Sequence, residues 1–390
     1  MQLKIVFTVL LLSFVFYSCN KKKHSHSINN ITTINITETD RPQGELLCTN
    51  IDALFDSIEF VKLETYQECL IGNIDKIEYY QNNFYILDKN ITRTLFCYSR
   101  QGSFNFKIHN EGKGPGEYIS IVDFTIDHSN NKIQILDFTS QKILTFNLDG
   151  KFISEKKCNE NTVKHIHSEK NLSYFDMGTN SGKYNILCYE QNKKAGSFFK
   201  LNKLLKDMPG SFDSRFCRSS EKTYYNPLLS DTIYQIDSII LEPKYYIDFG
   251  KQKIDIKRIT SNSNEIEKIN SVLNQDACQL NPMSYHTTKY VYLSFLKGRF
   301  PVSFHVFYNK EHNKLWCSNI VYAEKKAALN FIPFPKGVLE DAFYGDISSS
   351  SVKDIYDNFN SIQKQSLDQS IRDICITATE YNNPIIVIYK

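Results

Sequence analysis

An internal repeat constrains the fold of this chain more than any other feature. Residues 77–108 align with residues 122–153 with few gaps, and a strand-like apolar run ends at Asp88 in the first copy and at Asp137 in the second, 49 residues later. Each copy holds four such runs, separated by short polar or glycine-containing turns. Four short strands joined in this way form one antiparallel sheet, which covers both of its faces only by stacking against similar sheets. The repeat therefore predicts an all-β propeller in which each copy is one four-stranded antiparallel blade.

Weaker copies of the same unit follow at residues 165–199, 230–249 and 302–322. Because insertions lengthen the body, the repeat spacing fits about six or seven blades. The chain ends in the apolar run Ile385–Tyr389, and residues 60–64 have matching strand character. A closed ring leaves no free sheet edge, so we expect these two segments to pair within one blade.

Two insertions have helical periodicity. Apolar residues recur at intervals of three or four in segments 265–274 and 352–362. We therefore expect short helices at these places, appended to the propeller.

The first residues have the pattern of a secretory signal. Residues 5–16 form an apolar run that is shorter than the roughly 20 residues that a membrane-spanning helix needs. Ser18 and Cys19 follow, and this ending resembles the lipobox of bacterial envelope lipoproteins, in which the cysteine becomes the diacylated first residue. The resemblance implies a signal peptide at 1–18, a membrane anchor through lipid on Cys19, and a place in the bacterial cell envelope, periplasmic or at the outer membrane. An ordinary cleaved signal with an incidental cysteine is the alternative.

A polar segment separates this signal from the folded body. Lysine, histidine, serine, asparagine and threonine dominate residues 19–45, and such a composition buries too little apolar surface to offset the entropy of ordering. We therefore expect a flexible tether at 19–45 and the propeller at 46–390.

Charge and cysteine content exclude several kinds of site. The chain has 46 basic and 43 acidic residues, a net charge of +3 that is too small for the field that nucleic-acid binding needs. Its ten cysteines include no C-x-x-C pair, which excludes the common redox and zinc-ribbon motifs. Because several cysteines lie in apolar runs, we expect most of them to be buried packing residues.

Several segments of the body, in order along the chain, resemble one known family. These segments are Phe60-Val-Lys-Leu-Glu-Thr, Gly112-Lys-Gly-Pro-Gly-Glu-Tyr118, Ser230-Asp-Thr-Ile-Tyr, Tyr246-Ile-Asp-Phe-Gly250 and Asn383-Pro-Ile-Ile-Val-Ile-Tyr. They look like the bacterial six-bladed β-propeller lipoprotein family, which is distantly similar to NHL-repeat propellers. The resemblance implies six blades over about residues 55–390, and it implies no particular reaction.

The loop at 112–118 is the densest glycine cluster of the chain. A phosphate-binding loop would require G-x-x-x-x-G-K-[ST] before a helix, and the chain lacks that pattern. We interpret the loop as a tight connection between the first two blades. Lys113, Glu117 and Tyr118 remain candidate ligand-binding residues on one face of the propeller.

Two sets of side chains are candidates for metal binding. His165 and His167 lie two residues apart on one side of a strand, a spacing compatible with two metal ligands, but no third ligand accompanies them and we favour a structural or surface pair. Acidic residues near strand ends could hold calcium, as in calcium-dependent lactonase propellers, although turn capping is the preferred interpretation; they are Asp88, Asp137, Asp176 and Asp237. We assign no catalytic residue and no cofactor, and calcium is the ion that such acidic residues would bind.

These observations favour a membrane-tethered binding module that presents one face to a protein or a carbohydrate-type ligand. The alternatives are a metal-dependent hydrolase of the lactonase or esterase kind and a structural subunit of an envelope complex. Convergent carboxylates at the mouth of the central channel would favour the hydrolase, and an aromatic or apolar patch would favour the binding module.

Overall fold

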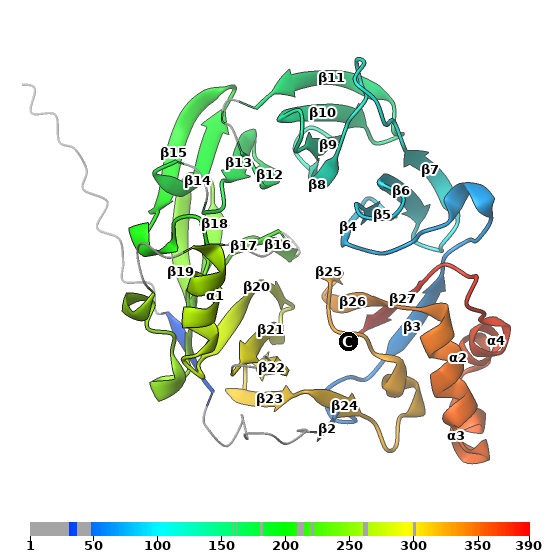
Figure 1. Cartoon of the computed structure of the whole chain (residues 1–390). Coiled ribbons are helices and arrows are strands. Elements are labelled where there is room, and N and C mark those ends of the chain that lie inside the picture. The colour runs from blue at the N-terminus through cyan, green and yellow to red at the C-terminus, as the bar shows by residue number, and fades with distance from the viewer. Residues whose placement is uncertain are drawn as a thin grey trace, which may run out of the picture. The chain divides into compact units, whose positions relative to one another are not determined.

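Six sheets arranged around a common centre form the body of this protein (Figure 1). The computed structural model describes residues 31–36, 48–158, 160, 162–179, 182–208, 214–219, 222–259, 264–298 and 302–390. The proposed signal peptide and Cys19 lie outside these residues. The expected six-bladed β-propeller of four-stranded antiparallel blades is confirmed, and one blade carries an added fifth strand.

The strands follow one another blade by blade, each blade running from its inner to its outer strand. Blades one to three consist of β4 (Lys76–Tyr80), β5 (Asn83–Asp88), β6 (Thr94–Ser99) and β7 (Phe104–Ile108); β8 (Ile121–Asp127), β9 (Lys132–Asp137), β10 (Lys142–Asn147) and β11 (Phe152–Lys157); and β12 (His165–Glu169), β13 (Leu172–Asp176), β14 (Tyr184–Glu190) and β15 (Lys193–Lys200). Blades four to six consist of β16 (Phe216–Ser219), β17 (Lys222–Tyr225), β18 (Thr232–Asp237) and β19 (Ile240–Asp248); β20 (Cys278–His286), β21 (Tyr290–Lys297), β22 (Val302–Asn309) and β23 (Lys314–Ser318); and β25 (Gly337–Leu339), β26 (Ala342–Ile347), β27 (Ile385–Tyr389) and β3 (Ile58–Lys62).

The sixth blade closes the ring with strands from both ends of the body. β27 pairs antiparallel with β3, from Ile385 opposite Lys62 to Tyr389 opposite Ile58, as expected from the sequence. All five residues of β27 are buried. Just before this strand, the Asn383 side chain donates to the carbonyl oxygens of Glu64 (2.7 Å) and Cys69 (2.8 Å). The last strand is therefore fixed by its ladder and by an amide that binds the segment after its partner.

A strand also forms within the segment that we expected to be a flexible tether. β1 (Thr32–Asn35) pairs in parallel with β19 at the outer edge of blade four, so the expectation is wrong for these residues. The physical reason is the alternation of the sequence, because Ile34 and Ile36 are both 1% exposed and pack into an apolar cluster. A second short strand, β2 (Cys48–Asn50), pairs in parallel with β24 (Ile320–Tyr322).

The helices lie in the insertions. α1 (Glu265–Leu273) confirms the first expected helix, whereas the second expected helix is divided into α2 (Ser349–Asn358) and α3 (Ser361–Ser366) because Phe359 and Asn360 are extended. The remaining helix is α4 (Gln369–Thr377), and the 3₁₀ turns are η2 (Gln67–Cys69), η3 (Lys203–Leu205), η4 (Gly250–Gln252), η5 (Ile256–Arg258) and η6 (Ala327–Phe331). Among the described residues no helix has the length and apolarity to cross a membrane.

None of the cysteine side chains that the structure describes forms a disulfide, and all of them except Cys158 are buried. This agrees with the interpretation of the cysteines as packing residues in apolar strands.

Ring closure predicts a large stability effect at β27. Ile386 is 0% exposed, and its replacement by Ala should lower the free energy of unfolding by about 3 kcal/mol, because the site loses apolar contacts and retains a cavity. Chemical unfolding followed by fluorescence measures the change. The matched control is Ile362→Ala on α3, where the side chain is 78% exposed and the midpoint should not move. Equal midpoints for both variants would contradict the closing role of β27.

Candidate functional site

Figure 1 shows the innermost strands of the six blades around the centre of the ring, and these strands line a cavity of about 560 Å³. These strands are β4, β8, β12, β16, β20 and β25. We call this cavity the central channel. Each inner strand adds at least one lining side chain, among them Glu78, Asp123, His165, Arg218, Tyr285 and Val338. A ligand there would contact every blade.

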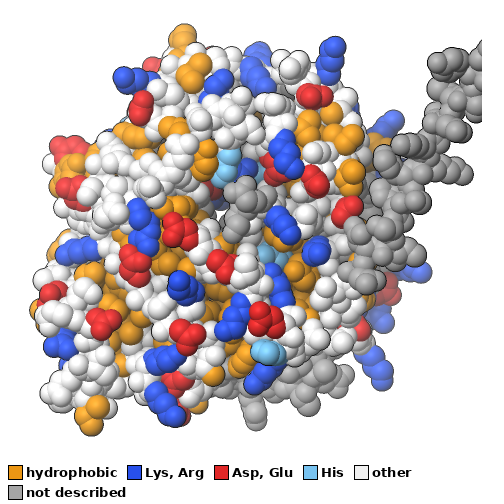
Figure 2. Space-filling model, turned by 180° about the vertical axis from the view of Figure 1, so that it is seen from behind, with side chains coloured by type: hydrophobic (Ala, Val, Ile, Leu, Met, Phe, Trp, Pro, Cys, Tyr) orange, Lys and Arg blue, Asp and Glu red, His pale blue; other side chains and the backbone are white. Residues whose placement is uncertain are grey.

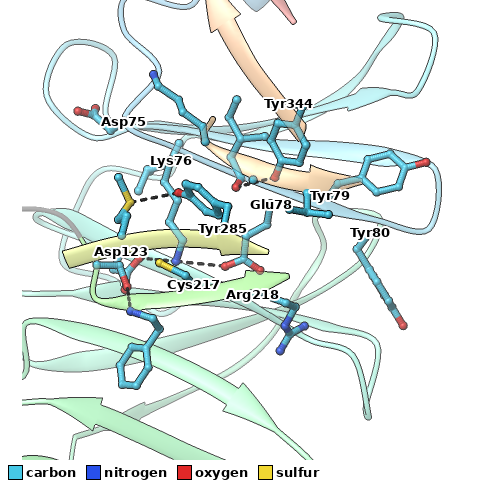
Figure 3. A pocket seen from close by; sticks show the side chains of 18 of the residues that line it. Asp75, Lys76, Glu78, Tyr79, Tyr80, Asp123, Cys217, Arg218, Tyr285 and Tyr344 are labelled. Atoms are coloured by element: carbon cyan, nitrogen blue, oxygen red, sulfur yellow. Dashed lines mark hydrogen bonds and ion pairs between the residues drawn. The ribbon is translucent and has the colours of Figure 1, made fainter. Parts of the chain in front are cut away.

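A lysine with two carboxylates forms one wall of the central channel. The Lys76 Nζ lies 2.8 Å from Asp123 Oδ1 and 3.1 Å from Glu78 Oε1. Figure 3 marks both contacts with dashed lines. It also donates to the carbonyl oxygen of Phe124 at 2.6 Å. Although burial disfavours the charged amine, the carboxylates of Asp123 and Glu78 raise the pKa of Lys76 on balance. Burial likewise opposes ionisation of Glu78, but the charge of Lys76 lowers its pKa below the ordinary value. Lys76 and Glu78 therefore stay ionised, and the lysine lies within ion-pair distance of both carboxyl groups.

Arg218 connects three blades in the channel. From β16 its Nη1 donates to the carbonyl oxygen of Ile126 in blade two (3.2 Å), and its Nη2 donates to that of Ser168 in blade three (2.9 Å). The backbone nitrogen of Ile126 in turn donates to Glu78 Oε2 at 3.1 Å. The guanidinium thus binds backbone carbonyls across the ring and helps to fix the inner strands relative to one another.

Aromatic rings line the channel beside these charges. Tyr79, Tyr80, Tyr285 and Tyr344 all contribute. Figure 3 shows Tyr285 and Tyr344 beside Lys76 and Glu78, whereas the rings of Tyr79 and Tyr80 lie further away. The Tyr80 ring stacks on His128, with centroids 3.9 Å apart and planes at 21°. Burial, reinforced by the positive charge of Arg218, lowers the pKa of His128 to about 4, so this imidazole is neutral at pH 7. The channel therefore combines ring faces with neutral hydrogen-bonding groups.

The two candidate histidines lie in the channel wall, where each has its own partners. His165 Nδ1 is 3.6 Å from Asp176 Oδ2. His167 Nε2 is 3.3 Å from Glu169 Oε2 and 3.1 Å from the Thr223 hydroxyl, and its ring stacks on Phe216. Burial lowers the pKa of His167 despite the hydrogen bond to Glu169. Within the part of the chain that the structure describes, no set of three His, Cys, Asp or Glu side chains is placed to hold a metal ion.

The glycine-rich loop connects β7 to β8, as expected for a link between the first two blades. Lys113 is exposed there, whereas Glu117 accepts a hydrogen bond from the Gly114 nitrogen at 2.7 Å. Tyr118 is 0% exposed and donates its hydroxyl to the carbonyl oxygen of Arg93 at 2.5 Å. These three candidate residues do not belong to the lining of the central channel.

Two of the strand-end aspartates hold turns. Asp88 Oδ2 accepts from the backbone nitrogens of Gly72 (2.9 Å) and Asn73 (3.1 Å). Asp137 accepts in the same manner from Ile119 (2.9 Å) and Ser120 (3.1 Å). The equivalent bonds in blades one and two agree with the turn-capping interpretation.

Sequence reasoning missed the charged wall of the channel. Lys76 and Asp123 occupy equivalent positions of the two repeats, because each pairs with the leucine, Leu87 or Leu136, that comes directly before the strand-end aspartate. Two charged residues of opposite sign at this position of the inner strands were the signal that could have found the wall.

The chain matches one family model over residues 31–390, the family described as domain of unknown function DUF4934. The chain belongs to this family. It is similar to a candidate exported protein from Bacteroides fragilis, with 19% identity, a TM-score of 0.72, and coverage of 92% of this chain and 99% of that one. A member of the DUF4221 family from Bacteroides vulgatus is 9% identical, with a TM-score of 0.47 and coverage of 85% and 98%. No curated protein matches the chain at a significant level.

The charged wall predicts a pH-dependent loss of stability. Lys76→Met should lower the free energy of unfolding by about 3 kcal/mol at pH 7, because it leaves the buried carboxyl group of Asp123 and the partly buried one of Glu78 without their cation. The pKa of Glu78 in the folded protein lies below its ordinary value of 4.5, so its ionised form stabilises the fold above pH 4.5 and that contribution is lost as the pH falls. The difference in the free energy of unfolding between wild type and variant should therefore become smaller in acid. Chemical unfolding at several pH values between neutral and acidic measures this difference.

The matched control for this experiment is Lys113→Met, which replaces an exposed lysine of the glycine-rich loop. Its unfolding should follow that of the wild type within about 0.5 kcal/mol at every pH. A Lys76→Met protein that behaves like this control would show that the wall is not an ion-paired unit.

Proposed function

We propose that this protein is an extracytoplasmic binding module, tethered to the cell envelope through lipid on Cys19, whose central channel binds a neutral carbohydrate-type ligand. The observation that carries the proposal is the pairing of tyrosine rings with internally neutralised charge in one cavity. A volume of about 560 Å³ lies within the range of small-molecule sites, roughly 300 to 1,000 Å³.

The charges of the channel support a neutral ligand. Lys76 pairs with Asp123 and Glu78, and Lys336, which also lines the channel, pairs with Asp346 at 2.6 Å. An ionic ligand would have to break such pairs and desolvate its own charge. Figure 2 shows basic and acidic side chains interspersed over one face of the molecule, so that face offers no field of one sign to steer an ion.

The aromatic rings support a ligand with both apolar faces and hydroxyl groups. Sugars have C–H faces that pack on aromatic rings and hydroxyls that exchange hydrogen bonds with amides and phenols. Tyr80 and Gln81 provide such groups together, since the Tyr80 hydroxyl and the Gln81 amide both donate to Asn131 Oδ1, at 2.7 and 3.0 Å. The carboxylates of Glu78 and Asp123 are engaged with Lys76, which favours binding over metal-assisted hydrolysis.

The proposed location has its own support. The apolar run at 5–16 followed by Ser18 and Cys19 has the lipoprotein pattern, and the structural relative from Bacteroides fragilis is described as a candidate exported protein.

The channel proposal predicts saccharide binding that depends on Tyr80. Calorimetric titration with a panel of neutral and uronic-acid-containing oligosaccharides should detect a neutral ligand, and Tyr80→Ala should weaken its binding about tenfold through loss of the stacking ring. Tyr381→Ala is the control, because that tyrosine is 78% exposed and lies outside the channel lining. Absence of any saccharide binding, or cleavage of a bound saccharide, would contradict the proposal.

The anchor predicts a change of cell fraction. Cys19→Ala should move the protein from the membrane fraction to the soluble fraction after export, because the acyl chains supply the attachment. Fractionation followed by immunoblotting measures this, with Cys158→Ala as the control that keeps the protein on the membrane. Unchanged membrane retention of the Cys19 variant would rule out acylation at this residue.

A further inference from the structure

A second cavity of about 440 Å³ lies beside the central channel, between blades four and five and under α1. Its walls are mainly apolar and combine one face of the helix with loop residues, including Met208, Leu228, Leu229, Ile269, Val272, Leu273 and Pro282. Polar residues also line it, among them Arg215, Asn226 and Asn281. We call this space the α1 cavity.

Arg215 and Asn226 are each 2% exposed. Arg215 Nη1 and Asn226 Oδ1 have no hydrogen-bond partner among the residues that the structure describes. The two residues come directly before β16 and directly after β17, and the pairing of Phe216 with Tyr225 makes them the next cross-strand pair. An unpartnered donor and an unpartnered acceptor therefore lie side by side on an apolar cavity, where unpaired polar atoms cost free energy.

The orientation of the Asn226 amide is fixed by its neighbour. Its Nδ2 donates to the carbonyl oxygen of Asn281 at 2.9 Å, and a carbonyl oxygen only accepts, so the amide cannot be turned round. The acceptor Oδ1 is thereby directed away from Asn281. A ligand that satisfies both orphan atoms must accept from Arg215 and donate to Asn226.

The backbone around the α1 cavity departs from regular structure at two places. The register of β20 with β21 shifts between Leu280 and Ser284, so that residues 281–283 bulge at Pro282, which has no N–H to give to the ladder. Leu229, which also lines the cavity, has a φ of +53°, a left-handed conformation that bulky residues rarely adopt. Bulges and strained residues of this kind concentrate at binding sites.

The charge near the polar end favours a neutral head group. Although burial opposes ionisation of Asp176, a hydrogen bond from His165 and the positive charge of Arg215 lower its pKa. Arg215 thus already has a carboxylate within range, and a second anion would repel Asp176. A carboxylate ligand would also leave Asn226 Oδ1 unpaired, because it has no donor.

From these observations we infer that the α1 cavity is a binding site for a small acyl amide, with its hydrocarbon chain against α1 and its amide between Arg215 and Asn226. The amide oxygen accepts from Arg215 Nη1, and the amide nitrogen donates to Asn226 Oδ1. This site is separate from the proposed saccharide channel, and either one can be tested without the other.

Methyl NMR of the purified protein labelled at its methionines tests this inference with octanamide and octanoate as probes. Met208 lines the α1 cavity and not the channel, Met283 lines both, and the buried Met177 lines neither. Octanamide should shift the Met208 and Met283 signals and leave Met177 unchanged. Octanoate should bind about tenfold more weakly, because it cannot donate to Asn226.

Two variants of the same helix locate the probe. Leu273→Trp places a ring in the α1 cavity and should abolish the Met208 shift, whereas Ile266→Trp on the outer face of α1, where the side chain is 69% exposed, should leave it intact. If Leu273→Trp does not fold, the three methionine signals of the wild type still decide the site. Three outcomes would overturn the inference. The first is that octanoate binds as tightly as octanamide, and the second is that Met177 shifts instead of Met208. The third outcome is that neither probe causes a shift, as expected for a cavity filled by water alone.

Discussion

The pairing of β27 with β3 joins the two ends of the body in one sheet, and the other five blades depend on it. A propeller blade covers its faces only with its neighbours, so an incomplete sixth blade would expose the inner faces of blades one and five as well as a free edge. Asn383 reinforces the joint, because its side chain binds the carbonyl oxygens of Glu64 and Cys69 and accepts from the Ile71 nitrogen at 2.9 Å. Closure also fixes the spacing of the six inner strands, and with it the width of the central channel.

Within that ring, the channel is polar because its inner strands carry charged groups that satisfy one another. The transfer of an ionised side chain out of water costs several kcal/mol, and this applies to Lys76, Glu78 and Asp123. Only close pairing together with further hydrogen bonds offsets this desolvation cost. Lys76 lies in blade one, whereas Asp123 and Phe124 lie in blade two. The contacts between them therefore also set the relative position of these two blades. Arg218 acts similarly with backbone carbonyls as its partners. The same interactions that hold the blades leave the cavity with paired charges beside its aromatic rings.

Much of this fold could be predicted from local sequence patterns. The parts that were not predicted are those that depend on contacts between residues far apart in the sequence. The repeat, the closing strand and α1 each have a periodicity that is visible within one segment. By contrast, β1 is an alternating Thr-Ile-Asn-Ile stretch in a polar region, and only the edge of β19, far along the chain, makes it a strand. The residues that line the channel could not be predicted without knowing which inner strands face one another. The glycine-rich loop was a candidate site because of its unusual glycine content. Glycine is needed there for the backbone conformation, as the φ of +78° at Gly116 shows, and Tyr118 of the same loop is buried.

One proline accounts for both the space and the polar character of the α1 cavity. Pro282 interrupts the β20 ladder, and three residues of β20 then lie opposite the single residue Ser294. The bulge is held by the Asn281 amide, which donates to the Ser294 hydroxyl at 2.9 Å, and it turns the Asn281 carbonyl toward blade four, where Asn226 donates to it. That bond decides which end of the Asn226 amide faces the cavity. A regular strand at this position would have filled the space with ladder hydrogen bonds and side chains, and Asn226 would have had no fixed acceptor to direct at a ligand.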